Sequence, residues 1–204
     1  MRNKRIIKIL FLFIIITFFS CKKKTLSRDD YAEYVTNEDN GLIKKQEFNG
    51  GITVELLYQP LEYIYLKERK ESAISLKDFE NWKIEKTNYE FYILRLRSNK
   101  TNEISQHNAS NFGEYTQTLD YLISDFQNDI VKVTGKDTLA CLLYHYERNF
   151  GISANNNFSL IFSKDKQNTD KTIVIDLKMY DLGNVKFKFT KEDIDNLPKL
   201  VLEV

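Results

Sequence analysis

The sequence predicts an α+β fold, built on a mainly antiparallel β-sheet with one long helix and two or three short ones. Three observations lead to this prediction. Strand-like segments follow one another with hairpin-like turns between them, a helical apolar stripe fills residues 110–127, and no β–α–β alternation with a glycine-rich turn is present. A nucleotide-binding parallel sheet is therefore disfavoured.

Alternation marks one strand in the first half of the chain, and residue type marks another. Ile52, Val54, Leu56 and Tyr58 alternate with their neighbours after an Asn-Gly-Gly turn, and Pro60 interrupts the run. Residues 89–97 (YEFYILRLR) are aromatic, β-branched or long and apolar, as strand residues commonly are. Between these strands, residues 61–66 (LEYIYL) are predicted to form an amphipathic strand with tyrosines at its margins; the alternative is a tyrosine-rich recognition patch.

The second half of the chain supplies the remaining strands. Two turns are expected, at residues 135–137 (Gly-Lys-Asp) and 181–184 (Asp-Leu-Gly-Asn). The predicted strands are 129–134, 138–147, 157–163, 172–180 and 184–190.

Four segments are predicted to be helical. In the longest, apolar residues recur at steps of three and four from Phe112 to Phe126. A short helix follows Ser27, whose side chain suits an N-cap with Asp30 three positions on, and Asn40-Gly41 ends that segment. The other two helices are residues 76–86 and a terminal turn at 191–196, stopped by Pro198.

The amino terminus has the layout of an export signal. Arg2, Lys4, Arg5 and Lys8 precede an apolar run of 11 residues, 9–19. That length suits a secretory signal, whereas a membrane-spanning helix needs about 20 apolar residues. Residues 1–20 are therefore predicted to be a signal peptide.

The residues after the apolar run predict lipid attachment. Phe18 is too large for an ordinary cleavage site. The stretch FFSC, residues 18–21, resembles a bacterial lipobox, although its −3 and −2 positions depart from the usual Leu and small residue. Lipoproteins of the Bacteroidota type have such loose boxes and a similar Asn-, Lys- and Ile-rich composition. Segments 40–42, 58–63 and 141–148 also resemble sequences of that type, and this resemblance implies no particular activity.

The resemblance implies that Cys21 is acylated and becomes the first residue of the mature chain. Residues 21–27 would then be the lipidated terminus and linker, and 28–204 a single globular α+β domain. Several acyl chains anchor a protein stably, and the three lysines after Cys21 would lie at the headgroups. In lipoproteins of this type, acidic residues just after the cysteine are associated with display on the cell surface. The lysines here depart from that pattern, so the resemblance implies an outer-membrane anchor with the protein facing the periplasm.

Composition excludes some functions for the mature chain. Removing residues 1–20 leaves 26 basic residues against 29 acidic ones, a net charge near −3. This balance gives no electrostatic footprint for nucleic acid. With Cys21 acylated, Cys141 is the only remaining thiol, so no intramolecular disulfide is expected.

The best chemical candidates lie within CLLYHYER, residues 141–148. On a strand, Cys141 and His145 are about 13 Å apart along the chain, too far to share a zinc ion or to form a catalytic pair, so a buried thiol is expected. His145 and Glu147 would share a face about 6.6 Å apart and form the candidate acid–base pair, or else a structural pair at a sheet edge.

The other polar residues give no site. His107, the only other histidine, lies in a polar stretch and is expected to be exposed. The carboxylate pairs Asp29-Asp30, Asp125 with Asp129, and Asp165 with Asp170 are expected to be solvated, and the 165–170 loop lacks the ligand pattern of a calcium loop. No metal and no cofactor is predicted.

These observations predict a membrane-anchored lipoprotein of the cell envelope, most simply a non-catalytic binding or accessory module with an envelope protein as its partner. Two alternatives stay open. One is an envelope enzyme, hydrolytic in type, that uses His145 and Glu147. The other is an immunity-type lipoprotein that blocks a toxin.

Overall fold

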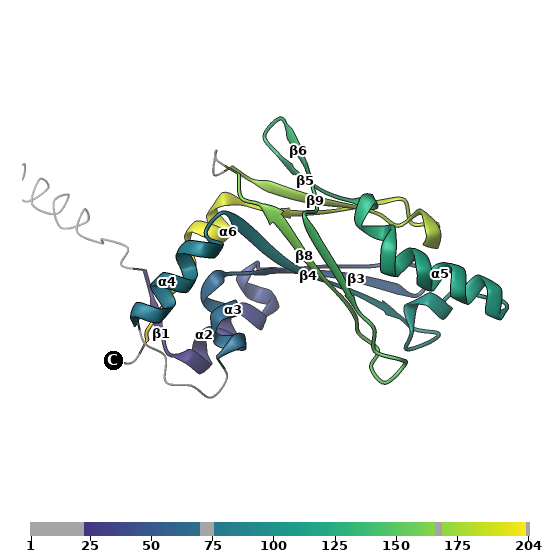
Figure 1. Ribbon diagram of the computed structural model, residues 1–204, viewed down its shortest axis with the longest axis horizontal. Helices are drawn as coiled ribbons and strands as arrows, with labels where there is room; N and C mark the ends of the chain where they lie inside the picture. The colour runs from purple at the N-terminus through teal and green to yellow at the C-terminus, as the bar shows by residue number, and fades with distance from the viewer. Residues whose placement is uncertain (1–22, 70–75, 166–168, 203–204) are drawn as a thin grey trace, which may run out of the picture.

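Two antiparallel sheets form the body of the protein (Figure 1). A computed structural model describes residues 23–69, 76–165 and 169–202. The larger sheet has the order β2-β3-β4-β8-β7, with strands Ile43–Glu47, Ile52–Gln59, Tyr89–Ser98, Asn156–Ser163 and Leu143–Glu147. The smaller has the order β10-β9-β5-β6, with strands Asn184–Phe189, Lys171–Asp176, Ile130–Thr134 and Asp137–Ala140. The predicted α+β class with mainly antiparallel sheets is confirmed.

The core lies between the two sheets. Strands β5, β8, β9 and β10 alternate strictly between buried and more exposed residues, so each presents one face to the interior. Aromatic rings join the sheets: Tyr92 of β4 lies 5.9 Å from Phe162 of β8 and 5.6 Å from Phe189 of β10, between ring centroids. Each fully buried side chain of this size contributes about 1.5–3 kcal/mol through removal from water.

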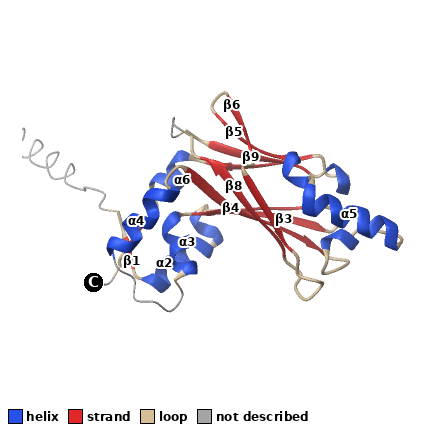
Figure 2. Ribbon diagram, viewed as in Figure 1, coloured by secondary structure: helices blue, strands red, loops and turns tan. Residues whose placement is uncertain are grey.

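Helix α5, Phe112–Ser124, covers one end of this core (Figure 2). Leu119 and Leu122 are buried in the core, together with Phe126 of the 3₁₀ helix Phe126–Asp129. Asn111 caps the helix by accepting a hydrogen bond from the Glu114 amide at 3.0 Å. The helix predicted at 110–127 is confirmed, and its last residues continue as the 3₁₀ turn.

The remaining helices gather at the opposite end (Figure 1). They are α2 Arg28–Thr36, α3 Leu61–Glu68, α4 Leu76–Lys86 and α6 Lys191–Asp195, beside the short parallel pair β1 Thr25–Leu26 and β11 Lys199–Leu200. Helices α2 and α3 cover part of the outer face of the larger sheet, where Tyr31, Val35, Leu57 and Ile93 form a second buried cluster. Ser27 caps α2 as predicted, accepting from the Asp30 amide at 3.3 Å.

Residues 61–66 are helical, so the strand predicted there is wrong. Pro60 is the N-cap of α3, and its carbonyl accepts from the Ile64 amide at 3.1 Å. Proline has a fixed φ that suits a helix start. Tyr65 and Leu66 are buried, and Tyr65 contacts Phe79 and Trp82 of α4 through its ring. The helix is thus stabilised by contacts with a neighbouring helix.

Two predicted strands are shorter than expected. Residues 138–147 are two strands, because the chain leaves the smaller sheet at Ala140 and enters the larger one at Leu143. Segment 172–180 forms β9 only to Asp176, and a 3₁₀ turn, Lys178–Tyr180, then leads into β10. Leu177 and Tyr180 are buried there, so burial of the turn ends the strand.

A charged triad closes the core at the end near helices α4 and α6. Glu90 of β4 accepts a 2.6 Å hydrogen bond from the Lys132 ammonium of β5, and its other oxygen pairs with Lys171 of β9. All three side chains are at most 3% exposed. Burial lowers the pKa of Lys132, while the hydrogen bond that Lys132 donates to Glu90 raises this pKa. Two buried cations therefore depend on one carboxylate.

The amino-terminal predictions fall outside the described residues. The signal peptide, residues 1–20, and Cys21 precede the first described residue, Lys23. Among the helices of the described residues, none has the length and apolar content to span a membrane.

We expect Glu90→Gln to destabilise the protein far more than Lys132→Met. The Gln variant leaves two buried ammonium groups without a carboxylate, which costs about 3–5 kcal/mol. The Met variant leaves the Glu90–Lys171 pair intact and fills a similar volume, so its cost should be below about 1.5 kcal/mol. Urea unfolding followed by circular dichroism measures both, and equal losses would contradict the dependence on Glu90.

Candidate functional site

His145 and Glu147 lie on β7, the edge strand of the larger sheet, and both are exposed. They share one face, as the strand period predicts. Glu147 accepts a hydrogen bond from the Ser159 hydroxyl at 3.2 Å and from the Asn157 amide at 3.5 Å, both on the adjacent strand β8. The hydroxyl thus bonds directly to the carboxylate, without an imidazole between them. In a serine–histidine–acid relay, the histidine lies between the serine and the acid.

His107 is buried, so its predicted exposure is wrong. Its Nδ1 lies 2.7 Å from the Ser98 hydroxyl, and its ring meets Tyr180 edge-on with 6.0 Å between centroids. Ile104, three residues earlier, is fully buried in the core, and this places the polar stretch against the core. Burial, and secondarily the Lys100 charge, lower the pKa of His107.

Cys141 is a buried thiol, as predicted. It lies where the chain crosses from one sheet to the other, and its sulfur donates to the Leu143 carbonyl at 3.1 Å. Burial raises the pKa of the thiol, so it remains protonated and is a poor nucleophile.

The carboxylates remain dispersed. Asp125 follows the last residue of α5, so Asp125 and Asp129 do not share a helix face; Asp129 instead accepts from Tyr121 and from Lys178 at 2.9 Å. Asp170 pairs with Lys188 at 2.7 Å. Within the described ranges, no group of three or more His, Cys, Asp and Glu side chains is placed to hold a metal ion.

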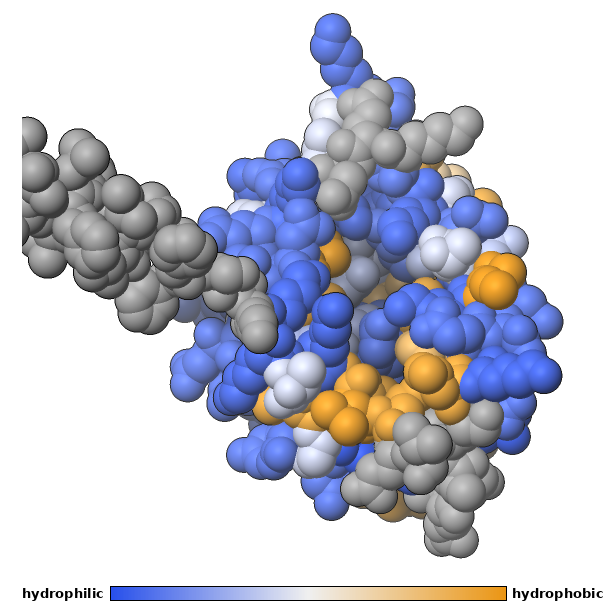
Figure 3. All heavy atoms as spheres, turned by 90° about the vertical axis from the view of Figure 1, so that its left-hand side faces the viewer, coloured by the Kyte–Doolittle hydropathy of each residue, from blue (hydrophilic) through white to orange (hydrophobic). Residues whose placement is uncertain are grey.

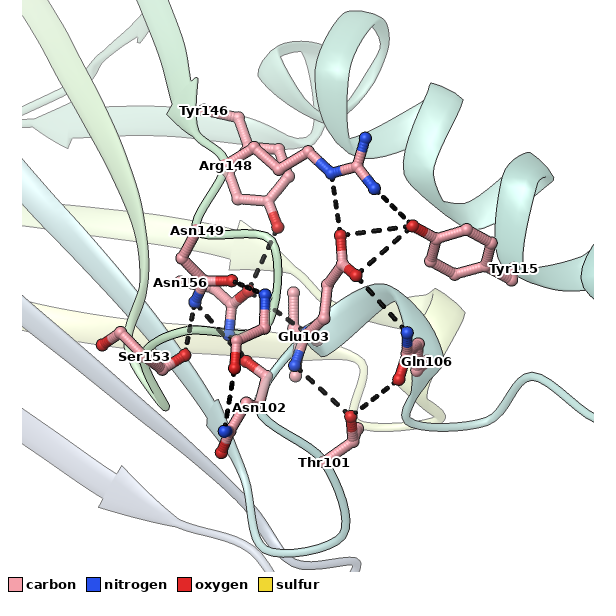
Figure 4. A network of polar contacts seen from close by, with 12 residues as sticks. Thr101, Asn102, Glu103, Gln106, Tyr115, Tyr146, Arg148, Asn149, Ser153 and Asn156 are labelled. Atoms are coloured by element: carbon pink, nitrogen blue, oxygen red, sulfur yellow. Dashed lines mark hydrogen bonds and ion pairs between the residues drawn. The ribbon is translucent and has the colours of Figure 1, made fainter.

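A dense polar network orders the end of the body that carries the β7–β8 connection (Figure 4). Asn156 is fully buried and bridges three segments. Its amide donates to the Asn102 carbonyl at 2.9 Å, and its oxygen accepts from the Ile104 amide and from the Tyr146 hydroxyl. Since these bonds are made by groups fixed in the core, the loop that follows β7 has a fixed base.

The loop itself is held by Asn149. The Asn149 side chain donates to the Ser153 and Asn155 carbonyls and accepts from the Gly151 amide at 2.9 Å. Asn102 closes the loop from outside by donating to the Gly151 carbonyl at 3.0 Å. This loop is therefore ordered by side-chain hydrogen bonds and not by burial of its own tip.

Arg148 connects the loop to helix α5. Its Nε donates to the buried carboxylate of Glu103 at 2.8 Å, and its Nη2 donates to the Tyr115 hydroxyl, which donates in turn to Glu103 (Figure 4). The bond to Glu103 is the largest cause of the raised pKa of Arg148. The guanidinium is thereby held by hydrogen bonds to Glu103 and Tyr115.

Around Arg148 lies a largely exposed surface, here called the tip surface: Phe112, Tyr115, Arg148, Phe150 and, two residues further along the loop, Ile152. Arg148 lies 4.6 Å from the centroid of the Phe150 ring, and the Phe112 and Tyr115 ring centroids are 6.0 Å apart. Phe112, Phe150 and Ile152 are 77%, 69% and 88% exposed. Three large apolar side chains thus stand in water on a rigid support.

Phe150 also has a strained backbone. Its φ is 52°, in the left-handed region that costs a non-glycine residue about 1–2 kcal/mol. Gly151 follows with a φ of 74°, which glycine tolerates. Strain held in place by surrounding hydrogen bonds concentrates at functional positions. Sequence reasoning missed this surface; the Asn-Phe-Gly-Ile-Ser run between two strands was its only local sign.

Comparison with known proteins yields no relative, because no protein-family model, curated sequence or solved structure matches this chain.

We expect His107→Gln to flatten the acid dependence of stability. The folded state holds this imidazole neutral with a lowered pKa, so the unfolded chain takes up the proton first as the pH falls through the ordinary value of about 6.5. The wild-type free energy of unfolding should thus decline from pH 7 to pH 5 more than that of the variant. Urea unfolding across this range measures both.

The exposed His145 provides the matched control, because His145→Gln removes the other histidine without touching the core. Its stability should follow the wild-type pH profile. A His107→Gln profile parallel to the wild type would show that burial of His107 does not influence acid stability.

Proposed function

We propose that the chain is a lipid-anchored lipoprotein of the bacterial cell envelope, held by acyl chains on Cys21, whose body is a non-catalytic module that binds an envelope protein. The exposed tip surface on its rigid support is the observation that carries the binding role. The anchor rests on the FFSC stretch and the short apolar run before it.

The separation between anchor and tip surface supports a protein partner over the membrane itself. Only Lys22, Lys23 and Lys24 separate Cys21 from β1, a tether of about 10 Å when extended. Figure 1 shows β1 at one end of the body and the connection between β7 and β8 at the other. The ten residues of β4, which run between these ends, alone span about 30 Å. An anchored body would thus present the tip surface away from its own membrane.

The composition of the tip surface suits protein recognition. Binding energy at protein interfaces concentrates in aromatic and arginine side chains, and the tip surface combines Phe112, Tyr115, Phe150 and Arg148. The hydrogen bonds of Asn149 and Asn156 order the loop before any partner arrives, which reduces the entropy lost on binding. A toxin blocked by an immunity-type lipoprotein would be one partner of this kind.

The enzyme alternative has less support. His145 and Glu147 are exposed on the outward face of an edge strand, and the Glu147 carboxylate already accepts a hydrogen bond from the Ser159 hydroxyl. Neither residue lines the cavity that lies between α3, α4 and α6.

Replacing Phe150 and Ile152 together by alanine should abolish partner binding while the fold persists. Both side chains are mainly exposed, so the free energy of unfolding should change by less than about 0.5 kcal/mol. Losing two anchors of an interface weakens binding by about a hundredfold or more. Chemical cross-linking in envelope membranes, followed by affinity purification and mass spectrometry, identifies the partner and measures the amount recovered per molecule of the protein.

Ile84→Ala is the control for that experiment, because Ile84 of α4 is 69% exposed but lies outside the tip surface. This variant should retain the partner. Recovery of no stoichiometric partner with the wild type, or equal recovery with the double variant, would contradict the binding role.

The anchor has a separate test. Cys21→Ser should abolish metabolic labelling with palmitate and release the protein from membranes, because the acceptor thiol is lost. Cys141→Ser, which removes the buried thiol, should keep the label. Persistent labelling of the Cys21 variant would rule out the lipobox interpretation.

A further inference from the structure

A cavity of about 590 Å³ opens at the end of the body that carries β1 and the C-terminal segment. It lies between α3, α4, α6, the segment 197–202 and the start of β4. This volume is in the range of small-molecule sites. In Figure 3, which faces this end, hydrophobic residues gather in the middle of the surface with hydrophilic residues around them.

Aliphatic and aromatic side chains form one part of the cavity wall, and polar groups form the rest. Its apolar lining includes Leu61, Leu76, Phe79, Ile194, Leu197 and Leu200. Leu76 is 57% exposed at the first turn of α4, although Phe79, one turn further, is buried. An apolar wall left open to water favours a ligand with an apolar portion of its own.

Lysines without an ion pair outnumber carboxylates without one among the described residues that line this cavity. Lys83 pairs with Glu62 at 2.8 Å, and Glu90 is held by the two buried lysines of the triad. Three further lining lysines, Lys23, Lys164 and Lys199, form no ion pair within the described ranges. Of the carboxylates that line the cavity, Glu80 alone forms no ion pair within the described ranges. Among the described lining residues, positive charge is therefore in excess.

Tyr31 adds a second polar feature. Its side chain is fully buried on the cavity wall, and its hydroxyl has no hydrogen-bond partner among the described residues. A buried hydroxyl without a partner is costly. Burial is the main cause that raises the pKa of Tyr31, so the hydroxyl stays protonated and can donate.

We propose that this cavity binds an anionic amphiphile, a molecule with one acyl chain and a carboxylate or phosphate head. The acyl chain would lie against Leu61, Leu76 and Phe79. The head would lie among Lys23, Lys164 and Lys199, since charge complementarity favours an anion over a neutral or cationic head. A fatty acid and a lysophospholipid share this chemistry. The proposal concerns the folded body and is independent of the tip surface.

Binding of a fluorescent fatty acid, dansylaminoundecanoic acid, tests the proposal. The full chain is held in nanodiscs of zwitterionic lipid, and the signal of empty nanodiscs is subtracted. Saturable binding is expected, and Lys164→Ala/Lys199→Ala should weaken it about tenfold, since each lost charge contributes up to about 1 kcal/mol. Leu76→Glu, at an exposed position, should weaken it at least as much by repelling both the chain and the head.

Lys136→Ala/Lys186→Ala is the matched control, because it removes two exposed lysines outside the cavity. Its affinity should equal that of the wild type, and thermal unfolding checks that every variant is folded. Competition with oleate and with lysophosphatidate distinguishes a carboxylate head from a phosphate head.

Four results would overturn the proposal. They are the absence of saturable binding above empty nanodiscs, unchanged affinity in both cavity variants, displacement by neutral undecanol as effective as by undecanoate, and displacement by inorganic phosphate alone. The third would mean that the head is not recognised, and the fourth that the acyl chain is not.

Discussion

Face-to-face packing of the two sheets is the constraint on which the rest of this structure depends. Each sheet buries one set of alternate residues, and neither set would be stable in water without the other. Tyr92, Phe162 and Phe189 meet across the interface, so the apolar layer is continuous from β8 to β10. The ends of such a sandwich still expose the layer unless other elements cover them.

The two ends are closed by different chemistry. At one end α5 and the Asn156 network cover the core, and the hydrogen bonds used there also order the loop that carries Phe150. At the other end the Glu90 triad closes the core, while α3, α4 and α6 stand away from it and leave a cavity. Both proposed binding regions thus arise from how the sandwich is completed at its ends.

The distribution of reactive groups is compatible with the proposed binding role. Cys141 is a buried, protonated thiol, and His107 is held in the core against Ser98 and Tyr180. The Ser159 hydroxyl bonds directly to the Glu147 carboxylate, so the exposed His145 does not stand between a hydroxyl and a carboxylate as it would in a catalytic relay. By contrast, Phe150 and Ile152 of the tip surface stand on a loop ordered by the Asn149 hydrogen bonds, and Phe112 stands on α5, an arrangement that suits the proposed recognition role.

The sequence by itself determined the elements whose pattern is local. The apolar stripe from Phe112 to Phe126 predicted α5, the Ser27 cap predicted α2, and alternation predicted β3, because backbone period decides which side chains share a face. Aromatic, β-branched and long apolar residues predicted β4. Backbone period also placed His145 and Glu147 on one face of a strand. The lipobox resemblance at Cys21 is likewise local, and lies outside the described residues.

Only the tertiary structure decided which elements meet. Strand-like residues continue through 138–147 without revealing that the chain changes sheets at Cys141, since local composition indicates a strand and not its partner. Residues 61–66 are ambiguous alone, and contacts of Tyr65 with α4 made them helical. Glu90, Lys132 and Lys171 are far apart in the chain, as are the residues of the tip surface and the cavity. Such sites depend on long-range packing, which no local pattern encodes.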